Sequence, residues 1–169
     1  FDADEHHKLA RRIAHESAVL LKNENDVLPL RPASGAKVAV IGEFARTPRY
    51  QGAGSSQVNP TKIDIPLDEL TASLGAGVTV DFAAGFSLDV DESDPALVDE
   101  AVRLAKSADH VVLFLGLPAQ AESEGYDRTT MELPANQRAL LEQVAGVNDS
   151  VIVVLVGGYT YERPLLVTG

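Results

Sequence analysis

Four short runs of valine, isoleucine and leucine, separated by amphipathic stretches, constrain the fold of this chain more than any other feature. The runs cover residues 37–42, 78–82, 110–115 and 150–156. Three of them are almost continuously apolar, which is typical of strands buried on both faces. All are far shorter than the roughly 20 residues that cross a bilayer. The runs therefore predict the strands of a buried sheet.

The stretches between these runs carry helical periodicity. Residues 66–74, 94–108 and 134–146 each place apolar side chains three or four positions apart, on one face of a helix. Ser93 is the expected N-cap of the second helix, and Gly146 is expected to end the third. Alternating strands and helices predict an α/β fold, a three-layer α/β/α sandwich around a mostly parallel sheet.

The N-terminal segment has a different character. Residues 5–22 place small and apolar side chains on one helical face, and residues 23–36 then break the pattern and favour an extended connector. We therefore expect residues 1–36 to form a lead-in helix and inter-domain linker, and residues 37–169 to form the α/β sandwich domain.

The two ends of the chain suggest that it is part of a larger assembly. Only thirteen residues follow Val156, too few to cover the outer edge of a fourth strand. We expect the sheet to be incomplete at the C-terminus and to be completed by other polypeptide or by formation of a homo-oligomer. The chain begins with Phe1, as an excised piece would, and residues 1–8 do not resemble a signal peptide. Cytoplasmic and secreted locations both stay open.

Composition excludes several classes of function. With 25 acidic and 14 basic side chains, the formal charge is −11, which argues against binding to nucleic acid or to an anionic membrane. The chain has no cysteine, so disulfides, thiolate chemistry and cysteine-ligated zinc are excluded.

A glycine-rich loop follows the first predicted strand. Ligands of open α/β sheets bind beyond the carboxyl ends of strands, and this loop contains the sequence GAGSS at residues 52–56. The glycines come ten residues after the strand and a third is missing, which argues against a dinucleotide site. Two interpretations stay open: a structural turn, or a ligand-contacting loop that uses Arg49, Gly54, Ser55 and Ser56.

A second, acidic loop follows the third predicted strand. Residues 116–133 are eighteen residues without helical or strand periodicity, and they include Glu122, Glu124, Asp127 and Arg128. Loops in compact domains usually have about 4–6 residues. The loop is either a solvated acidic segment or a mobile segment that delivers a carboxyl group as a general acid, with Asp127 and Arg128 as an orienting charge pair.

Five segments together resemble a known family. The resemblance covers nearly the whole chain in the correct order, and its combination of motifs is far more specific than any single one. The segments are HESAVLLKNENDVLPL (15–30), KVAVIGEFA (37–45), RYQGAGSSQVNP (49–60), ESEGYDRTTMELPANQRALL (122–141) and SVIVVLVGG (150–158). They are similar to the second domain of glycoside hydrolase family 3, which is best known for β-glucosidases.

The resemblance implies a retaining β-glycosidase, most specifically a β-glucosidase, acting on a β-linked glycoside or oligosaccharide. Its nucleophilic aspartate would lie on an N-terminal barrel that this chain does not contain. Residues 1–36 would be the exit from that barrel and the linker, and residues 37–169 the first two-thirds of a six-stranded sandwich. No metal or organic cofactor is implied, because the chemistry needs two carboxyl groups and water.

The resemblance also assigns roles to residues. The acid/base corresponds to Glu124, the glutamate immediately before Gly-Tyr-Asp-Arg, with Glu122 as the alternative. Asp127 and Arg128 would anchor the acidic loop, and the GAGSS loop would line the sugar site. The residues after Gly158 depart from the family pattern, which usually resembles G-S-P-V-E-M-P-W.

Without a nucleophile, we expect the isolated chain to hydrolyse no glycoside measurably. The alternative hypothesis is a non-catalytic carbohydrate-binding or interaction module of the same fold. An upstream barrel in the longer polypeptide would favour the enzyme over this module.

Overall fold

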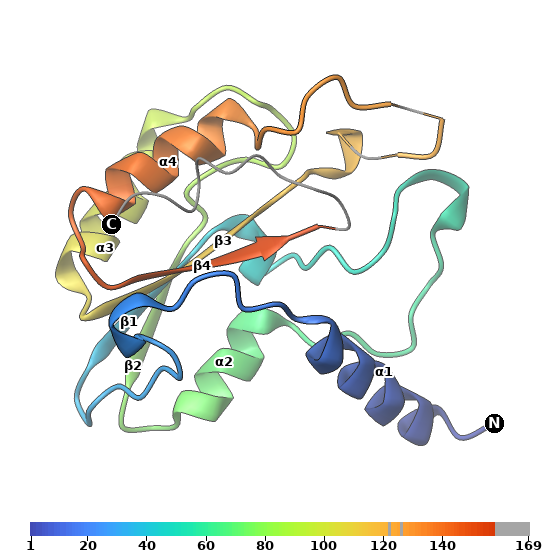
Figure 1. Cartoon of the computed structure of the whole chain (residues 1–169), viewed down its shortest axis with the longest axis horizontal. Helices are drawn as coiled ribbons and strands as arrows, with labels where there is room; N and C mark the ends of the chain where they lie inside the picture. The colour runs from blue at the N-terminus through green and yellow to red at the C-terminus, as the bar shows by residue number, and fades with distance from the viewer. Residues whose placement is uncertain (122, 126, 158–169) are drawn as a thin grey trace.

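The computed structural model describes residues 1–121, 123–125 and 127–157, and within them a four-stranded parallel sheet forms the centre of the chain. The strands are β1 (Lys37–Ile41), β2 (Thr79–Ala83), β3 (His110–Gly116) and β4 (Val151–Val156). Their order across the sheet is β2-β1-β3-β4, and every neighbouring pair is parallel (Figure 1). The predicted α/β class and parallel sheet are confirmed.

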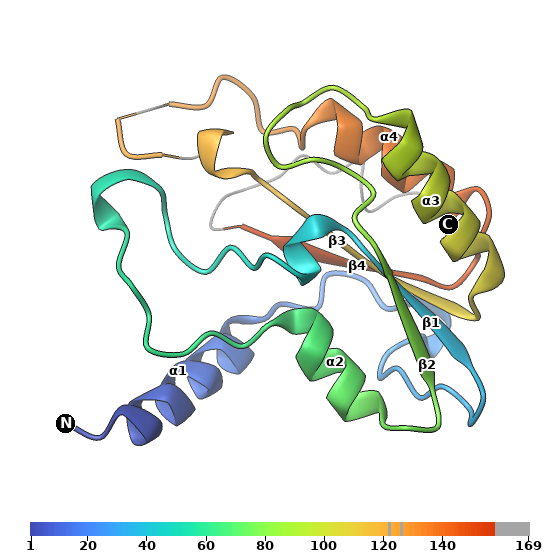
Figure 2. The same cartoon turned by 180° about the vertical axis from the view of Figure 1, so that it is seen from behind.

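Helices cover both faces of this sheet. α3 (Pro95–Ser107) and α4 (Ala135–Ala145) lie on one face, and α2 (Pro66–Leu74) lies on the other, as Figures 1 and 2 both show. The three leucines of α2 at positions 67, 70 and 74 pack against the core, as their spacing predicts. The three-layer arrangement expected from the sequence is therefore present.

The N-cap of α3 differs from the expected Ser93. Asp94 occupies that position, with extended backbone angles and a carboxylate that accepts a hydrogen bond from the Ala96 amide. Pro95 takes the first helical position, so the residue directly before it becomes the cap. At the other end of the third predicted helix, Gly146 caps α4 as expected.

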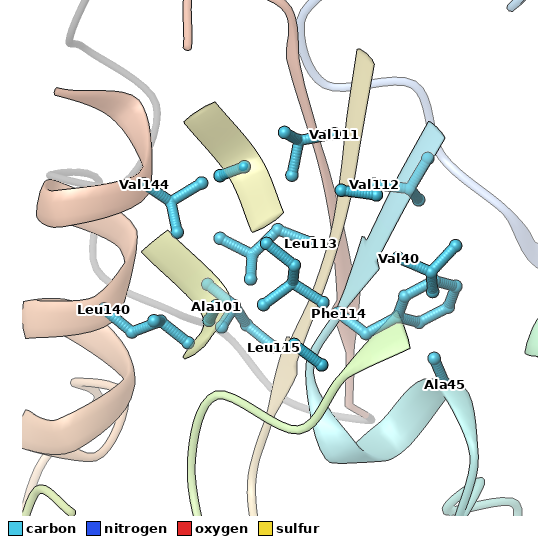
Figure 3. Close-up of a cluster of buried hydrophobic side chains, with 14 of the residues drawn as sticks. Val40, Ala45, Ala101, Val111, Val112, Leu113, Phe114, Leu115, Leu140 and Val144 are labelled. Atoms are coloured by element: carbon cyan, nitrogen blue, oxygen red, sulfur yellow. The ribbon is translucent and has the colours of Figure 1, made fainter. Parts of the chain in front are cut away.

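The core surrounds the sheet on both faces, with α3 and α4 on one side and the leucines of α2 on the other. β3 contributes the largest share, because Val111 to Leu115 are all buried between β1 and β4. On the face that α3 and α4 cover, Ala101 of α3 and Leu140 and Val144 of α4 belong to the same buried cluster (Figure 3). The small residues Ala101 and Ala105 of α3 are fully buried, which allows the helix to approach the strands closely.

The lead-in helix α1 (Ala3–Ser17) lies outside this core and is shorter than predicted. It ends at Ser17, five residues before the expected end, and Ala18 is already extended. None of its residues is buried, so no packed face extends the helix further. Charged contacts to Asp64 and Glu69 hold it beside α2, including Arg11 to Glu69 at 2.9 Å. A hydrogen bond from Lys62 also keeps the pKa of the Asp4 carboxyl below its ordinary value.

β4 forms one edge of the described sheet. Among the described residues it pairs only with β3, and Val153 in its middle is 38% exposed. The expected completion of the sheet by other polypeptide or by a second copy stays a prediction. The departure from the family pattern after Gly158 falls on residues outside the described ranges.

Candidate active site

The two loops singled out in the sequence follow the two central strands of the sheet. Residues 42–65 connect β1 to α2, and residues 117–134 connect β3 to α4. Chain order reverses between β1 and β3, because β2 lies on one side of β1 and β3 on the other. Both loops project from the same side of the molecule, to the right in Figure 1 and to the left in Figure 2. Ligands of open α/β sheets bind at such a reversal, beyond the carboxyl ends of the strands.

The tips of the two loops meet. Ala53 and Ser123 form a parallel β-bridge, although 70 residues separate them in the sequence. Gly54 has a positive φ of 83°, and a Cβ atom built on it would lie 3.3 Å from the Cβ of Glu124. A side chain at position 54 would therefore be strained by its backbone and crowded by the acidic loop. This contact brings the predicted glycine-rich and acidic loops into one site.

Glu124 is the carboxylate at this junction. Its side chain is exposed, and one of its carboxylate oxygens accepts a hydrogen bond from the Ser55 hydroxyl. Ser55 lies in the 3-10 turn Gly54–Ser56, so the glycine-rich loop holds the acidic side chain directly. The arrangement leaves a carboxyl group facing solvent, with a neutral hydroxyl as its partner, where it could exchange a proton with a bound ligand.

Two other carboxylates near this edge form ion pairs with arginines. Glu43 accepts hydrogen bonds from Arg46 at 2.8 and 3.2 Å and from the Thr47 hydroxyl at 2.8 Å. The Glu43 carboxylate raises the pKa of Arg46 above its ordinary value. Glu132, in the acidic loop, pairs with Arg138 at 3.0 Å. Glu43 and Glu132 are thus each paired with an arginine, whereas Glu124 is bonded to the neutral hydroxyl of Ser55.

Arg49 connects the two loops. Its guanidinium donates to the carbonyl oxygens of Leu117 at 2.5 Å and Pro118 at 3.1 Å. It therefore ties the glycine-rich loop to the first residues of the acidic loop. Its predicted contact with a substrate stays a prediction.

The remaining site residues are distributed around the junction. The Ser56 hydroxyl donates to the Ala53 carbonyl at 3.3 Å and so closes its own turn. Asp127 is exposed, and its side chain makes no hydrogen bond or ion pair with another described residue, whereas Arg128 is half-buried. Their anchoring role stays a prediction. Glu122, the alternative acid, lies outside the described ranges.

Clusters of metal-ligating side chains and long apolar helices are both absent from the part of the chain that the structure describes. No group of three or more histidine, aspartate or glutamate side chains there could hold a metal ion. Nor is any helix in those ranges long and apolar enough to cross a membrane.

The sequence analysis missed one residue at the root of the acidic loop. Gln137, in the first turn of α4, is buried, and its side-chain amide bonds both backbone polar groups of Gly116. A signal was present in the sequence. Leu140 and Val144 define the apolar stripe of the helix, and position 137 continues that stripe with a polar side chain. A polar residue at a core-facing position is satisfied by hydrogen bonds when it is buried.

Known proteins with similar sequences are glycosidases. An exo-alpha-(1->6)-L-arabinopyranosidase of Bifidobacterium longum is 53% identical over 165 residues, covering 94% of this chain and 21% of that protein. The thermostable beta-glucosidase B of Acetivibrio thermocellus is 46% identical, covering 97% of this chain and 22% of that protein. The chain thus spans about a fifth of the length of these relatives.

The fold agrees with a solved structure of the same kind. The crystal structure of a GH3 beta-glucosidase from Bifidobacterium adolescentis superposes with a TM-score of 0.86 at 53% identity, covering 95% of this chain and 23% of that one. Residues 18–166 match the model of the glycosyl hydrolase family 3 C-terminal domain. The chain therefore belongs to glycosyl hydrolase family 3, as part of the C-terminal domain of that family.

Proposed function

We propose that this chain supplies the general acid/base, Glu124, of a retaining glycosidase whose nucleophilic aspartate lies on a barrel domain of the same longer polypeptide. One observation carries the proposal. Two loops from the central strands meet through the Ala53–Ser123 bridge and present an exposed carboxyl group at their junction. Family membership makes glycoside hydrolysis the chemistry that such a carboxyl group would serve.

The proposed reaction has two steps. The aspartate attacks the anomeric carbon while Glu124 gives its proton to the departing glycosidic oxygen, which leaves a covalent glycosyl-enzyme. Glu124 then removes a proton from water, and that water attacks the anomeric carbon and releases the aspartate. Retention of configuration needs the two carboxyl groups about 5–5.5 Å apart. An exposed Glu124 on a loop is accessible to an opposing domain at that distance.

The proposed substrate is a terminal glycoside with an equatorial leaving oxygen. The relatives are named for α-L-arabinopyranosides and β-glucosides, and both kinds of sugar carry that oxygen equatorially in their stable chair. Gly54, Ser55 and Ser56 would line the sugar site from this domain. Arg49 would support them through its hold on the acidic loop.

The division of the chain follows from the same proposal. Residues 1–36 would form the lead-in helix and linker from the barrel, and residues 37–169 would form the partial sandwich domain. The exposed side chains of Val19, Leu20 and Leu21, together with α1, would then lie near the domain interface.

The isolated 169-residue chain is expected to hydrolyse no glycoside, because it carries the proton donor without a nucleophile. The longer polypeptide with its upstream domain is expected to hydrolyse an aryl β-glucoside or α-L-arabinopyranoside. Both proteins should be assayed at equal concentration. Turnover by the highly purified short chain would contradict the division of catalytic groups. A well-folded long form that is inert on every glycoside would favour a carbohydrate-binding or interaction module.

Replacing Ser55 by alanine in the longer enzyme is expected to lower kcat by about 2–10-fold, the equivalent of a hydrogen bond contributing about 0.5–1.5 kcal/mol. The substitution removes the hydroxyl that holds the Glu124 carboxylate. Ser107→Ala is the matched control, because the Ser107 hydroxyl bonds only a carbonyl within its own helix, that of Leu104. Equal kcat values for Ser55→Ala and the unchanged enzyme would show that Ser55 does not hold the acid during turnover.

A further inference from the structure

Gln137 makes an unusual contact with the end of β3. Its side chain is only 2% exposed. The Oε1 atom accepts a hydrogen bond from the Gly116 amide at 2.9 Å, and the Nε2 atom donates to the Gly116 carbonyl at 2.8 Å. One carboxamide thus satisfies both backbone polar groups of a single residue, as a neighbouring strand would.

Gln137 takes the place of a neighbouring strand beside the last residues of β3. β1 pairs with β3 only as far as Ile41 and Leu113, whereas β4 continues to Gly116. The last residues of β3 therefore extend beyond β1. Buried backbone amides and carbonyls must find partners, and Gln137 supplies them to Gly116.

Gly116 is confined on its other side as well. A Cβ atom built on it would lie 2.4 Å from the carbonyl oxygen of Val156 in β4, a separation that a side chain cannot adopt. The end of β3 is thus held between the β4 backbone and the Gln137 amide. Its direction is fixed by packing on one side and by two hydrogen bonds on the other.

The acidic loop begins directly after this point. Arg49 binds the carbonyls of Leu117 and Pro118, so three consecutive residues are held by side chains from two different elements. Glu124 lies six residues after Pro118. Its carboxylate accepts a hydrogen bond from Ser55, and the preceding residue, Ser123, forms the bridge with Ala53. Between these two attachments Ala119 and Gln120 are exposed and Ala121 is half-buried, so no buried side chain holds this part of the loop in the described ranges. The position of Glu124 therefore depends on where the loop starts and where its tip is bridged.

We propose that Gln137 is a positioning residue for the general acid, acting through Gly116 to set the direction in which the acidic loop leaves the sheet. The inference rests on the proposed role of Glu124. Gln137 touches no substrate. It acts by holding the loop so that the carboxyl group of Glu124 meets the leaving oxygen.

The test compares substrates that need the acid with one that does not. Gln137→Met keeps the length of the side chain and removes both hydrogen bonds. In the longer enzyme, kcat on an alkyl β-glucoside is expected to fall about 10–100-fold, because a small misplacement of a catalytic group has effects of this size. The leaving group of 2,4-dinitrophenyl β-glucoside departs without a proton. On this substrate the rate at which the glycosyl-enzyme forms should therefore change little. That first step is measured as the presteady-state burst of dinitrophenolate.

Two further variants keep the test decisive. Gln137→Glu retains the acceptor for the Gly116 amide, and it replaces the methionine variant if that variant fails to fold. Asn148→Leu is the matched control. The Asn148 amide also donates to two backbone carbonyls, those of Ala105 and Ala108, but at the opposite end of the sheet. Asn148→Leu should lower the stability of the fold without changing the ratio of the rates on the two substrates.

The outcomes separate this inference from the proposed function. If Gln137→Met lowers the rates on both substrates by the same factor, or lowers neither rate, Gln137 has a purely structural role and the inference is wrong. Glu124→Ala is measured alongside. If Glu124→Ala shows the leaving-group dependence and Gln137→Met does not, only the positioning role fails. If neither shows it, the assignment of Glu124 fails and the positioning role fails with it.

Discussion

Replacing Glu124 by alanine in the longer enzyme is expected to slow hydrolysis of an alkyl β-glucoside by about 10²–10⁴-fold, the usual contribution of a general acid. The alkoxide cannot leave at a useful rate without a proton, and the exposed carboxyl group at the loop junction is the proposed source. Hydrolysis of 2,4-dinitrophenyl β-glucoside should instead become limited by its second step, in which water loses its general base. A burst of dinitrophenolate followed by a slow steady rate is the expected signature.

Glu132→Ala is the matched control for this result. Glu132 lies in the same acidic loop, but its carboxylate is paired with Arg138. Its removal should change kcat by less than the Glu124 substitution on every substrate. If Glu124→Ala retained most of its activity on the alkyl glucoside, the acid would lie elsewhere, and Glu122→Ala would be the next variant to measure.

Replacing Leu113 by alanine is expected to lower the free energy of unfolding by about 2–5 kcal/mol, as large-to-small substitutions in a packed core do. Leu113 is 0% exposed in the middle of β3 and lies among the side chains that join the sheet to α3 and α4 (Figure 3). Close-packed surroundings cannot fill the cavity that the lost atoms leave. Urea unfolding of the chain, followed by circular dichroism, measures the difference.

Leu9→Ala provides the same chemical change at an exposed position. Leu9 is 54% exposed on α1, and exposed substitutions usually change stability by less than about 0.5 kcal/mol. If both substitutions lowered the free energy of unfolding by a comparable amount, β3 would not be the centre of the cooperative core.

The fold was largely predictable from the sequence because its signals are local and strong. Each of the four apolar runs became a strand, and the helical periodicities at 66–74, 94–108 and 134–146 became α2, α3 and α4. The end of α1 was not predictable from periodicity, because its apolar stripe continues beyond Ser17 while the described structure packs nothing against it. The N-cap of α3 was misplaced by one residue, since both Ser93 and Asp94 have capping side chains and only the position next to Pro95 decides between them.

The site was predictable at the level of its two loops. Their place after buried strands put them at one edge of the sheet, but no pattern in the sequence reveals that Ala53 and Ser123 form a bridge. The role of Arg49 was harder to anticipate, because an arginine in a polar loop is equally suited to a ligand and to backbone carbonyls. Its contacts with Leu117 and Pro118 depend on how two distant loops fold together.

Rescue by azide tests the central claim most directly. With Glu124→Ala and an activated aryl β-glucoside, the glycosyl-enzyme should accumulate, because no base activates water. Azide needs no base, so added azide should restore turnover and yield a β-glucosyl azide, with the configuration of the substrate retained. Accelerated turnover with that product would establish Glu124 as the acid/base. Turnover unaffected by azide, or an α-glucosyl azide as the product, would contradict the account.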